Sequence, residues 1–166
     1  MNAHLEQMRV PMLEHLGLVE IETVRTRIPC NAPDLEKVVG AMRPRADGRN
    51  GNVRIYVPDR HAKAQARIHD RYELARGKIR ANFNGPVLFA LVYHRKATKE
   101  NWRRHRTEQD THKPDVDNVA KLVMDALSGV AYRDDKQVVG LVAEAAPRFG
   151  DMDWYEIEVT YCEANR

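Results

Sequence analysis

Two aspartates spaced two residues apart, Asp115 and Asp117, are the residues of this chain best suited to chemistry. They follow Pro114, which pushes the backbone of Lys113 towards an extended conformation, and in an extended segment side chains at i and i+2 point the same way. Two carboxylates held close together raise each other's pKa unless a cation lies between them. Because carboxylate oxygens suit Mg²⁺ or Mn²⁺ better than zinc, the pair predicts a divalent-cation site.

A short amphipathic helix is expected directly after this pair. Asp117 is predicted to be its N-cap, with Val119 opening the helix. Lys121 lies one turn after Asp117 and one turn before Asp125, so an ammonium is expected beside the carboxylates. The positive end of a helix also favours phosphates. Opposite the lysine, residues placed about 100° apart form one apolar face, which consists of Val119, Leu122, Val123, Ala126, Leu127 and Val130.

Two further aspartates, Asp134 and Asp135, stand at the start of the next apolar run. Together with the first pair they bring three or four carboxylates towards Lys121. A few carboxylates with open positions for a substrate are typical of Mg²⁺ sites in enzymes that act on phosphate groups. The convergence of these carboxylates therefore predicts a site for Mg²⁺ or Mn²⁺.

These residues resemble the RusA Holliday junction resolvases. The resemblance rests on three motifs, which are Asp115-x-Asp117-Asn118-x-x-Lys121, Asp125-Ala126-Leu127 and Asp134-Asp135-x-Gln137-Val138. Upstream, Arg43-Pro44-Arg45 and a short strand through Tyr56 also resemble the family, so that most of residues 19–161 are covered. The compound motif is far more specific than a single Asp-x-Asp.

The resemblance implies a homodimer that places two active sites across a four-way DNA junction and makes paired nicks during recombination and repair. It implies that Asp115, Asp117 and Asp135 are metal-binding catalytic residues and that Lys121 is the essential lysine. The implied cofactor is Mg²⁺, with Mn²⁺ as a substitute. Because the loop before Asp134 is one residue shorter than the family pattern, Asp134 and Asp135 remain alternatives for the third carboxylate.

Charge is strongly segregated along the chain, although the net charge is only +3. Residues 40–113 carry 18 Lys and Arg against 7 Asp and Glu, whereas residues 114–166 carry 5 against 11. A metal-dependent nuclease requires a basic part that holds a polyanion beside an acidic part that holds the metal. Basic faces are often only solvated, so the charge is weaker evidence than the motif.

Candidate DNA contacts lie in the segment 43–45, on one stripe of the helix expected at 58–82, and in the loop 96–112. Trp102 in that loop is a candidate for stacking on a base or wedging a junction. A solvated face for the stripe and a packing role for Trp102 are the structural alternatives. The basic candidates are Arg43, Arg45, Arg60, Lys63, Arg67, Arg71, Lys96, Lys99, Arg103, Arg104 and Arg106.

The overall pattern predicts one α+β domain over residues 19–166, with a RusA-like mixed sheet of about five strands packed by two main helices. The last strand alternates strictly and is expected to be half-buried and to close the sheet. Residues 1–18 form an N-terminal extension that is a short helix, a dimer-contacting arm or, as is common for termini, a flexible segment. Strands are expected at 19–28 (edge-like, with a bulge), 53–57, 86–93, 138–146 and 154–161, and a short helix at 34–40.

Nothing in the composition indicates a membrane or export segment. No apolar stretch approaches the ~20 residues that a membrane span needs, and the N-terminus lacks a positive region followed by an apolar one. Cys30 and Cys162 form no paired-cysteine motif. They are expected to be reduced thiols of a cytoplasmic protein, associated with the nucleoid during repair.

Two other functions remain open at this point. Another Mg²⁺-dependent enzyme, such as a nucleotidyl or glycosyl transferase, can use an Asp-x-Asp pair, although the chain offers no glycine-rich nucleotide cradle. A nucleic-acid-binding module without catalysis would use its acidic cluster only to cap the helix. A Mg²⁺-dependent cleavage assay on junction and linear duplex DNA separates these alternatives.

Overall fold

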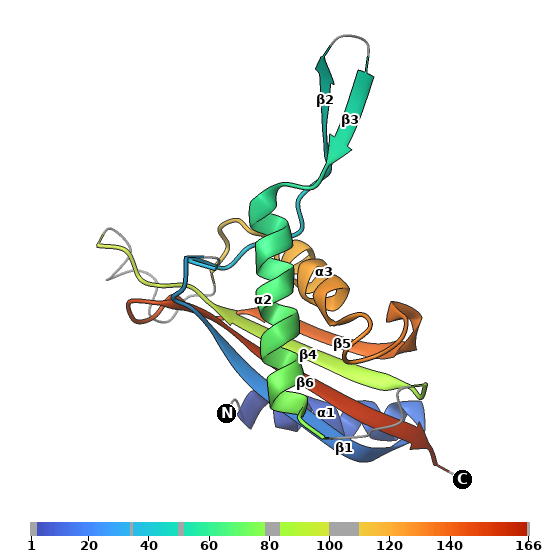
Figure 1. The fold of residues 1–166 in the computed structure, drawn as a ribbon. Helices are drawn as coiled ribbons and strands as arrows, with labels where there is room; N and C mark the ends of the chain where they lie inside the picture. The colour runs from blue at the N-terminus through green and yellow to red at the C-terminus, as the bar shows by residue number, and fades with distance from the viewer. Residues whose placement is uncertain (1–2, 34, 50–51, 79–83, 100–109, 166) are drawn as a thin grey trace.

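A four-stranded mixed sheet forms the centre of the computed structural model, which describes residues 3–33, 35–49, 52–78, 84–99 and 110–165 (Figure 1). The strand order is β1-β6-β4-β5, in which β4 and β5 are parallel and the other neighbours are antiparallel. The strands are β1 (Leu18–Cys30), β4 (Val87–His94), β5 (Val138–Ala145) and β6 (Asp153–Ala164). This arrangement confirms the predicted α+β class.

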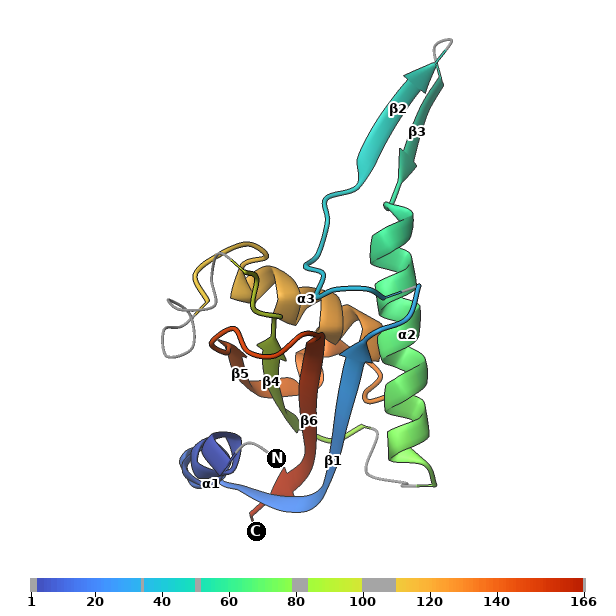
Figure 2. The same ribbon diagram turned by 90° about the vertical axis from the view of Figure 1, so that its left-hand side faces the viewer.

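Helices cover both faces of the sheet. α2 (Asp59–Arg76) and α3 (Val116–Leu127) pack on one face, and α1 (Ala3–Leu16) lies on the other (Figure 2). β4 lies between two strands and is covered on both faces, so its residues are nearly all buried, as its continuous apolar run predicts. The predicted apolar face is confirmed, because Val119, Leu122, Val123, Ala126 and Leu127 are buried in α3, and Val130, just beyond the end of the helix, is buried too.

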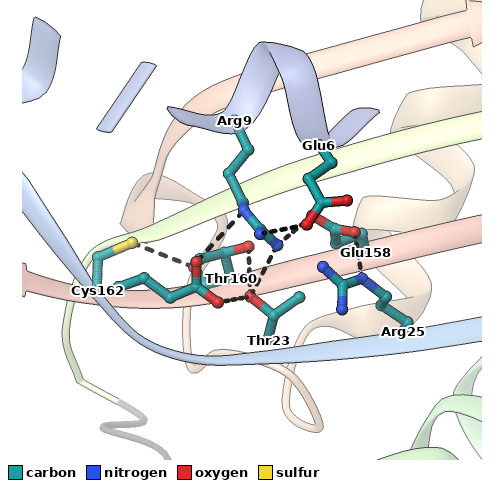
Figure 3. Close-up of polar contacts among 8 residues, drawn as sticks. Glu6, Arg9, Thr23, Arg25, Glu158, Thr160 and Cys162 are labelled. Carbon is teal, nitrogen blue, oxygen red and sulfur yellow. Dashed lines mark hydrogen bonds and ion pairs between the residues drawn. The ribbon is translucent and has the colours of Figure 1, made fainter. Parts of the chain in front are cut away.

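α1 is held on the sheet by a polar network centred on Arg9 (Figure 3). The Arg9 guanidinium donates to Glu158 Oε1 at 3.0 Å and to Thr23 Oγ1 at 3.3 Å. Arg25 Nε donates to the other carboxylate oxygen of Glu158 at 2.7 Å. Glu158 is buried and hydrogen-bonded to charged donors on both sides, which makes its burial tolerable. Within the N-terminal extension, residues 3–16 therefore form a helix that packs on the sheet.

Replacing Arg9 with Ala is expected to destabilise the protein by about 2 kcal/mol, because it removes charge-assisted hydrogen bonds from a buried carboxylate that retains only Arg25. For a chain of this size the melting temperature should fall by about 4–8 °C in a calorimetric scan. Gln7→Ala removes an exposed side chain from the same helix and serves as the control. Equal melting temperatures for the two variants would contradict the role given to Arg9.

α1 also explains why the prediction for β6 is only partly correct. β6 is antiparallel, as expected, but it lies between β1 and β4 and does not close the sheet. Its polar positions Glu158 and Thr160 are buried, since Glu158 binds Arg9 and Arg25 and the Thr160 hydroxyl lies 3.0 Å from that of Thr23. β1 is the edge strand that was predicted, and its register shifts between Glu20 and Glu22 as a bulge requires.

Three further predictions need correction. Of the helix predicted at 34–40, residue 34 lies outside the described residues, and residues 35–40 form no helix. They run as an irregular segment whose backbone amides bond to β6, and the following Ala41 amide bonds to α3. α2 ends at Arg76, where Gly77 adopts a positive φ of 54°, instead of continuing towards residue 82. The strand expected at 53–57 does not join the main sheet. It pairs as β3 (Asn52–Tyr56) with β2 (Arg45–Arg49), so the main sheet has four strands.

The β2–β3 hairpin projects from the body of the protein (Figures 1 and 2). Val53 and Ile55 are 71% and 72% exposed, and Tyr56 and Val57 are also exposed. An isolated two-stranded hairpin is only marginally stable in water, and exposed apolar side chains on it indicate an interaction surface. Among the described residues, no helix is both long and apolar enough to cross a membrane.

Candidate active site

The aspartate pair lies at the N-terminus of α3, beside the end of β4. Asp115, not Asp117, is the N-cap, with extended backbone angles and no side-chain capping bond, and its carbonyl accepts the first helical hydrogen bond from Val119. The prediction of Asp117 as N-cap is therefore wrong, because the helix begins at Val116 and places Asp117 in its first turn. Both aspartates are exposed, so their carboxylates are available to a ligand.

Tyr93 connects this helix start to the sheet. Its hydroxyl donates to the Pro114 carbonyl at 2.9 Å. Burial raises the pKa of Tyr93, and the negative charges of Asp110, Asp115 and Asp117 raise it further. The aspartate pair therefore lies close enough to the Tyr93 hydroxyl, at the end of β4, for its charges to affect that group.

A buried carboxylate, Asp110, anchors the segment that leads into α3. Its side chain is 1% exposed, and it accepts hydrogen bonds from Arg148 Nε and from the His112 amide, both at 3.1 Å. Arg95 lies 3.1 Å from the same carboxylate and donates to the carbonyls of His112 and Lys113 at 3.2 and 2.6 Å. Arg95 thereby fixes the two residues that precede Pro114.

The irregular segment before the hairpin is docked on the same helix start. The Ala41 amide donates to the Asn118 carbonyl at 2.7 Å, and the Val39 amide donates to the Tyr155 hydroxyl at 2.6 Å. Between them Gly40 passes so close that an added Cβ would lie 2.9 Å from the Pro114 Cβ and 3.2 Å from that of Asn118. Only glycine allows this approach without a shift of the backbone.

These segments enclose an open cleft of about 670 Å³. Asp115 and Asn118 line it from α3, and Asp153 and Glu36 are the other carboxylates in its wall. Asp153 is occupied, since its two oxygens accept from the Lys96 and Val38 amides. The basic side chains outnumber the acidic ones, so the cleft favours an anion. They are Lys37, Arg60, Arg95, Lys96, Lys113 and Arg148.

The predicted DNA contacts occupy different places. Arg60 and Lys96 line the cleft, and Lys63 lines a second hollow of about 380 Å³ together with Arg60. Arg43 and Arg45 are exposed where the chain leaves the cleft for the hairpin.

Three further candidates that the structure describes do not line the cleft. Arg67 and Arg71 are half-buried further along α2, with their Nε atoms shielded from solvent. Lys99 is exposed. Four candidates of the basic loop lie outside the described residues, namely Trp102, Arg103, Arg104 and Arg106.

Asp134 and Asp135 have different environments. The Asp134 carboxylate caps a single 3₁₀ turn (Asp135–Gln137) by accepting from the Lys136 amide at 3.0 Å, which lowers the pKa of Asp134, and it pairs with Lys136 Nζ at 3.2 Å. The Gln137 side chain accepts from the Asp134 amide at 3.1 Å and completes a capping box. Asp135 is exposed, so of the two alternatives it has the more available carboxylate.

The 3₁₀ turn lies at the start of β4, far from the aspartate pair. Gln137 Nε2 donates to the Gly85 carbonyl at 2.8 Å, and Val138 pairs with Val87 at the beginning of the strand. Tyr93, which contacts the pair's loop, is six residues further along β4, or about 20 Å at the rise of a strand. Asp115 and Asp117 therefore do not meet Asp135 within one chain.

A metal is implied by the carboxylates, whose oxygen donors suit Mg²⁺. The positions of these side chains in a single chain do not fit one ion, because the third carboxylate lies at the opposite end of β4. Consistent with this, no group of three or more His, Cys, Asp or Glu side chains within the described ranges is placed to hold a metal ion.

Several residues of the site were not singled out from the sequence. Asp110, Arg148 and Asp153 carry its buried hydrogen bonds, and Gly40 makes its closest backbone contact. They could not be predicted from the sequence, because they come from four separate segments that only the folded sheet brings together.

Comparison with known proteins identifies the family of this chain. The family model described as endodeoxyribonuclease RusA matches residues 36–160, which include the hairpin, α2, the cleft, α3 and the 3₁₀ turn. The match begins after β1, later than the predicted residue 19. A relative in Bacillus subtilis (strain 168), the uncharacterized protein YqaN, is 34% identical over 114 residues, which cover 62% of this chain and 77% of that protein. The chain belongs to the RusA endodeoxyribonuclease family.

Proposed function

We propose that this protein is a structure-selective endodeoxyribonuclease that resolves four-way DNA junctions, as a homodimer and with Mg²⁺ or Mn²⁺ as cofactor. One observation carries the proposal, namely an exposed aspartate pair of which Asp115 lines a basic cleft, in a chain of the RusA family. A cleft with six basic side chains attracts a phosphate backbone, and the carboxylates at its rim attract a cation.

The chain's own residues have separable roles in this proposal. The basic side chains of the cleft hold the phosphates on either side of the cleavage position. Lys121 is exposed on α3, one turn beyond Asp117, and has no ion pair within 4 Å with any residue that the structure describes. Its ammonium is therefore available to neutralise charge on the phosphate, which is the kind of electrostatic stabilisation that catalyses phosphoryl chemistry. A bound divalent cation would supply Lewis-acid chemistry at the same place.

Junction cleavage is the direct test of the proposed function. The purified protein is incubated with a labelled four-way junction and with a linear duplex of the same sequence, each with and without Mg²⁺. We expect paired nicks in opposing strands of the junction, dependent on the cation, and little cleavage of the linear duplex. Equal cleavage of both substrates would contradict junction selectivity, and binding without cleavage would favour the catalytically inactive module.

Binding measured over a range of salt concentrations tests the path of the DNA. Arg60→Ala with Lys96→Ala removes two charges from the cleft, so the slope of log K against log salt should become flatter by nearly ~2. Arg67→Ala with Arg71→Ala removes the same charge from α2 outside the cleft and serves as the matched comparison. A larger change for the second pair would place the DNA along the helix instead of in the cleft.

A further inference from the structure

The β2–β3 hairpin projects from the body of the protein and has two different faces (Figures 1 and 2). Ala46 pairs with Ile55, and Val53 lies two residues before Ile55 on the same strand, so these three side chains share one face. Val53 and Ile55 are 71% and 72% exposed. Arg45 pairs with Tyr56 on the other face, and both are exposed. The hairpin therefore combines a bare aliphatic face with an arginine on the opposite face.

The segment that leads into the hairpin, residues 38–42, is fixed to the body of the protein through its backbone. Four of its amides donate hydrogen bonds of 2.6–3.0 Å to the rest of the chain, and they belong to Val38, Val39, Ala41 and Met42. The Met42 amide donates to Nδ1 of His61, which is buried in the first turn of α2. The other end of the hairpin enters α2 through Pro58. Both ends are therefore held, which fixes the direction of the hairpin relative to the cleft.

The same segment lines the basic cleft, so the hairpin continues the surface on which we propose the DNA lies. Residues 38–42 all belong to the wall of the cleft, and the hairpin begins three residues beyond them, at Arg45. Arg43 and Arg45 are exposed at its base. These two guanidinium groups add to the attraction of the cleft for a phosphate backbone. DNA held in the cleft would therefore pass the base of the hairpin.

We propose that the aliphatic face of the hairpin inserts at the branch point of the DNA and packs on a base pair that has no stacking neighbour there. The inference rests on the proposed function and names the element that distinguishes a branched substrate from a linear one. Each strand of the hairpin has five residues and is about 17 Å long, more than the ~8.5 Å depth of the major groove, so it can reach the bases from the backbone.

The cost of insertion differs between the two kinds of DNA. Apolar side chains that enter a continuous duplex have to separate stacked bases, which costs free energy at each step. At an open branch point this stacking is already absent, so the same insertion costs less and still removes aliphatic surface from water. The hairpin should therefore contribute to junction binding and not to the binding of linear duplex.

A second copy of this chain is the other occupant to consider for the aliphatic face. A stable interface between proteins buries ~800 Å² on each partner, which two aliphatic side chains on a two-stranded ribbon do not approach. A second hairpin would also bring its own arginines towards Arg43 and Arg45, and like charges repel. A polyanion complements these arginines, and its bases complement the aliphatic face. The size and charge of this surface therefore favour DNA.

Val53→Ser with Ile55→Ser tests the proposal, because both side chains are exposed and their exchange should leave the fold intact. Binding to a four-way junction and to a linear duplex of the same sequence is measured in the presence of EDTA, so that cleavage does not interfere. We expect the double variant to bind the junction about 10-fold more weakly than the wild type, as the loss of a stacking contact does. Its affinity for the linear duplex should be unchanged. Leu74→Ser removes an aliphatic side chain that is 74% exposed on α2, outside the hairpin, and is the matched control.

A chemical cross-link locates the hairpin without relying on affinity. The natural thiols of Cys30 and Cys162 are buried, so Ile55→Cys supplies the accessible thiol. The junction carries a base with a tethered, activated disulfide, either next to the branch point or one helical turn away along an arm. The protein thiolate attacks this disulfide, which joins the protein to the tether and releases the activating thiol. We expect the covalent complex to form much faster with the tether at the branch point, and equal rates at both positions would overturn the proposal.

The affinity measurements can also overturn it, once melting temperatures show that the serine variants are folded. Equal weakening on junction and linear duplex would place the hairpin in a groove of the duplex, and unchanged junction binding would leave the aliphatic face without this role. A double variant that sediments as a monomer where the wild type is a dimer would show that the face contacts a second copy. Failure of the wild-type protein to bind either DNA would instead contradict the proposed function itself.

Discussion

Asp117→Asn should lower single-turnover cleavage of a four-way junction by at least ~100-fold, comparable to the loss of one preorganised stabilising group. The substitution keeps the size of the side chain and removes one negative charge from the pair that we propose binds the cation. Junction binding should be retained or improved, because Asp117 lies next to Asn118, which lines the basic cleft, and its negative charge repels phosphate. Cleavage and binding are measured separately, by quenched-flow sampling and by gel shift.

The structure makes this substitution a clean one. Asp117 is exposed in the first turn of α3 and makes no capping bond, so Asn should cost only the helix-dipole interaction of about 0.3–1 kcal/mol. Asp125→Asn removes the same charge from the other end of the helix and tests whether any loss of charge has this effect. Normal cleavage by Asp117→Asn at low Mg²⁺ would show that the carboxylate assignment is wrong.

Lys121→Ala should abolish most cleavage at saturating DNA and Mg²⁺ while folding and junction binding stay near those of the wild type. An ammonium that stabilises charge developing only in the transition state lowers turnover more than it weakens binding. Lys121→Arg should restore little activity, because a guanidinium is larger, planar and differently hydrated. Single-turnover rates and the melting temperature are the measurements.

The alternative for Lys121 is an ordinary surface residue of the helix. Its pairs with Asp117 and Asp125 would then be worth only ~0.3–0.5 kcal/mol each. The structure places no carboxylate of the described residues within 4 Å of Lys121, so even this small stabilisation is missing. Near wild-type cleavage by Lys121→Ala would show that this lysine is an ordinary surface residue without a catalytic role.

The sequence predicted the elements whose patterns depend on local packing. The apolar face of α3 and the buried run of β4 are confirmed because their periodicity follows directly from burial in the core. The hairpin escaped prediction for a physical reason. Glycine, asparagine and arginine between residues 45 and 52 indicate a turn. The strand that pairs with the predicted one, Arg45–Arg49, contains no β-branched or aromatic residue.

Errors arose where a distant segment supplies the hydrogen bonds. Residues 35–40 were predicted as a helix, but Asp153 and Tyr155 of β6 bind their backbone amides and hold them in an irregular path. Glu158 and Thr160 suggested a solvent-facing side of β6, because the sequence did not reveal that α1 would cover it. The carboxylates were correctly chosen as residues, but their separation along β4 follows from the parallel crossover, which spacing along the chain does not show.

The pairing of β1 with β6 has a mechanical consequence. Leu18 is paired with Ala164, and the Asn165 amide donates to the Gly17 carbonyl at 2.9 Å, so the two ends of the sheet pair lie side by side. A force applied between the chain ends would therefore break the hydrogen bonds between β1 and β6 one after another, instead of loading all of them at the same time. Before the first strand bond broke, Arg9 would have to release Glu158. In an optical trap this protein should unfold at low force. Unfolding should begin with the release of α1, far from the cleft.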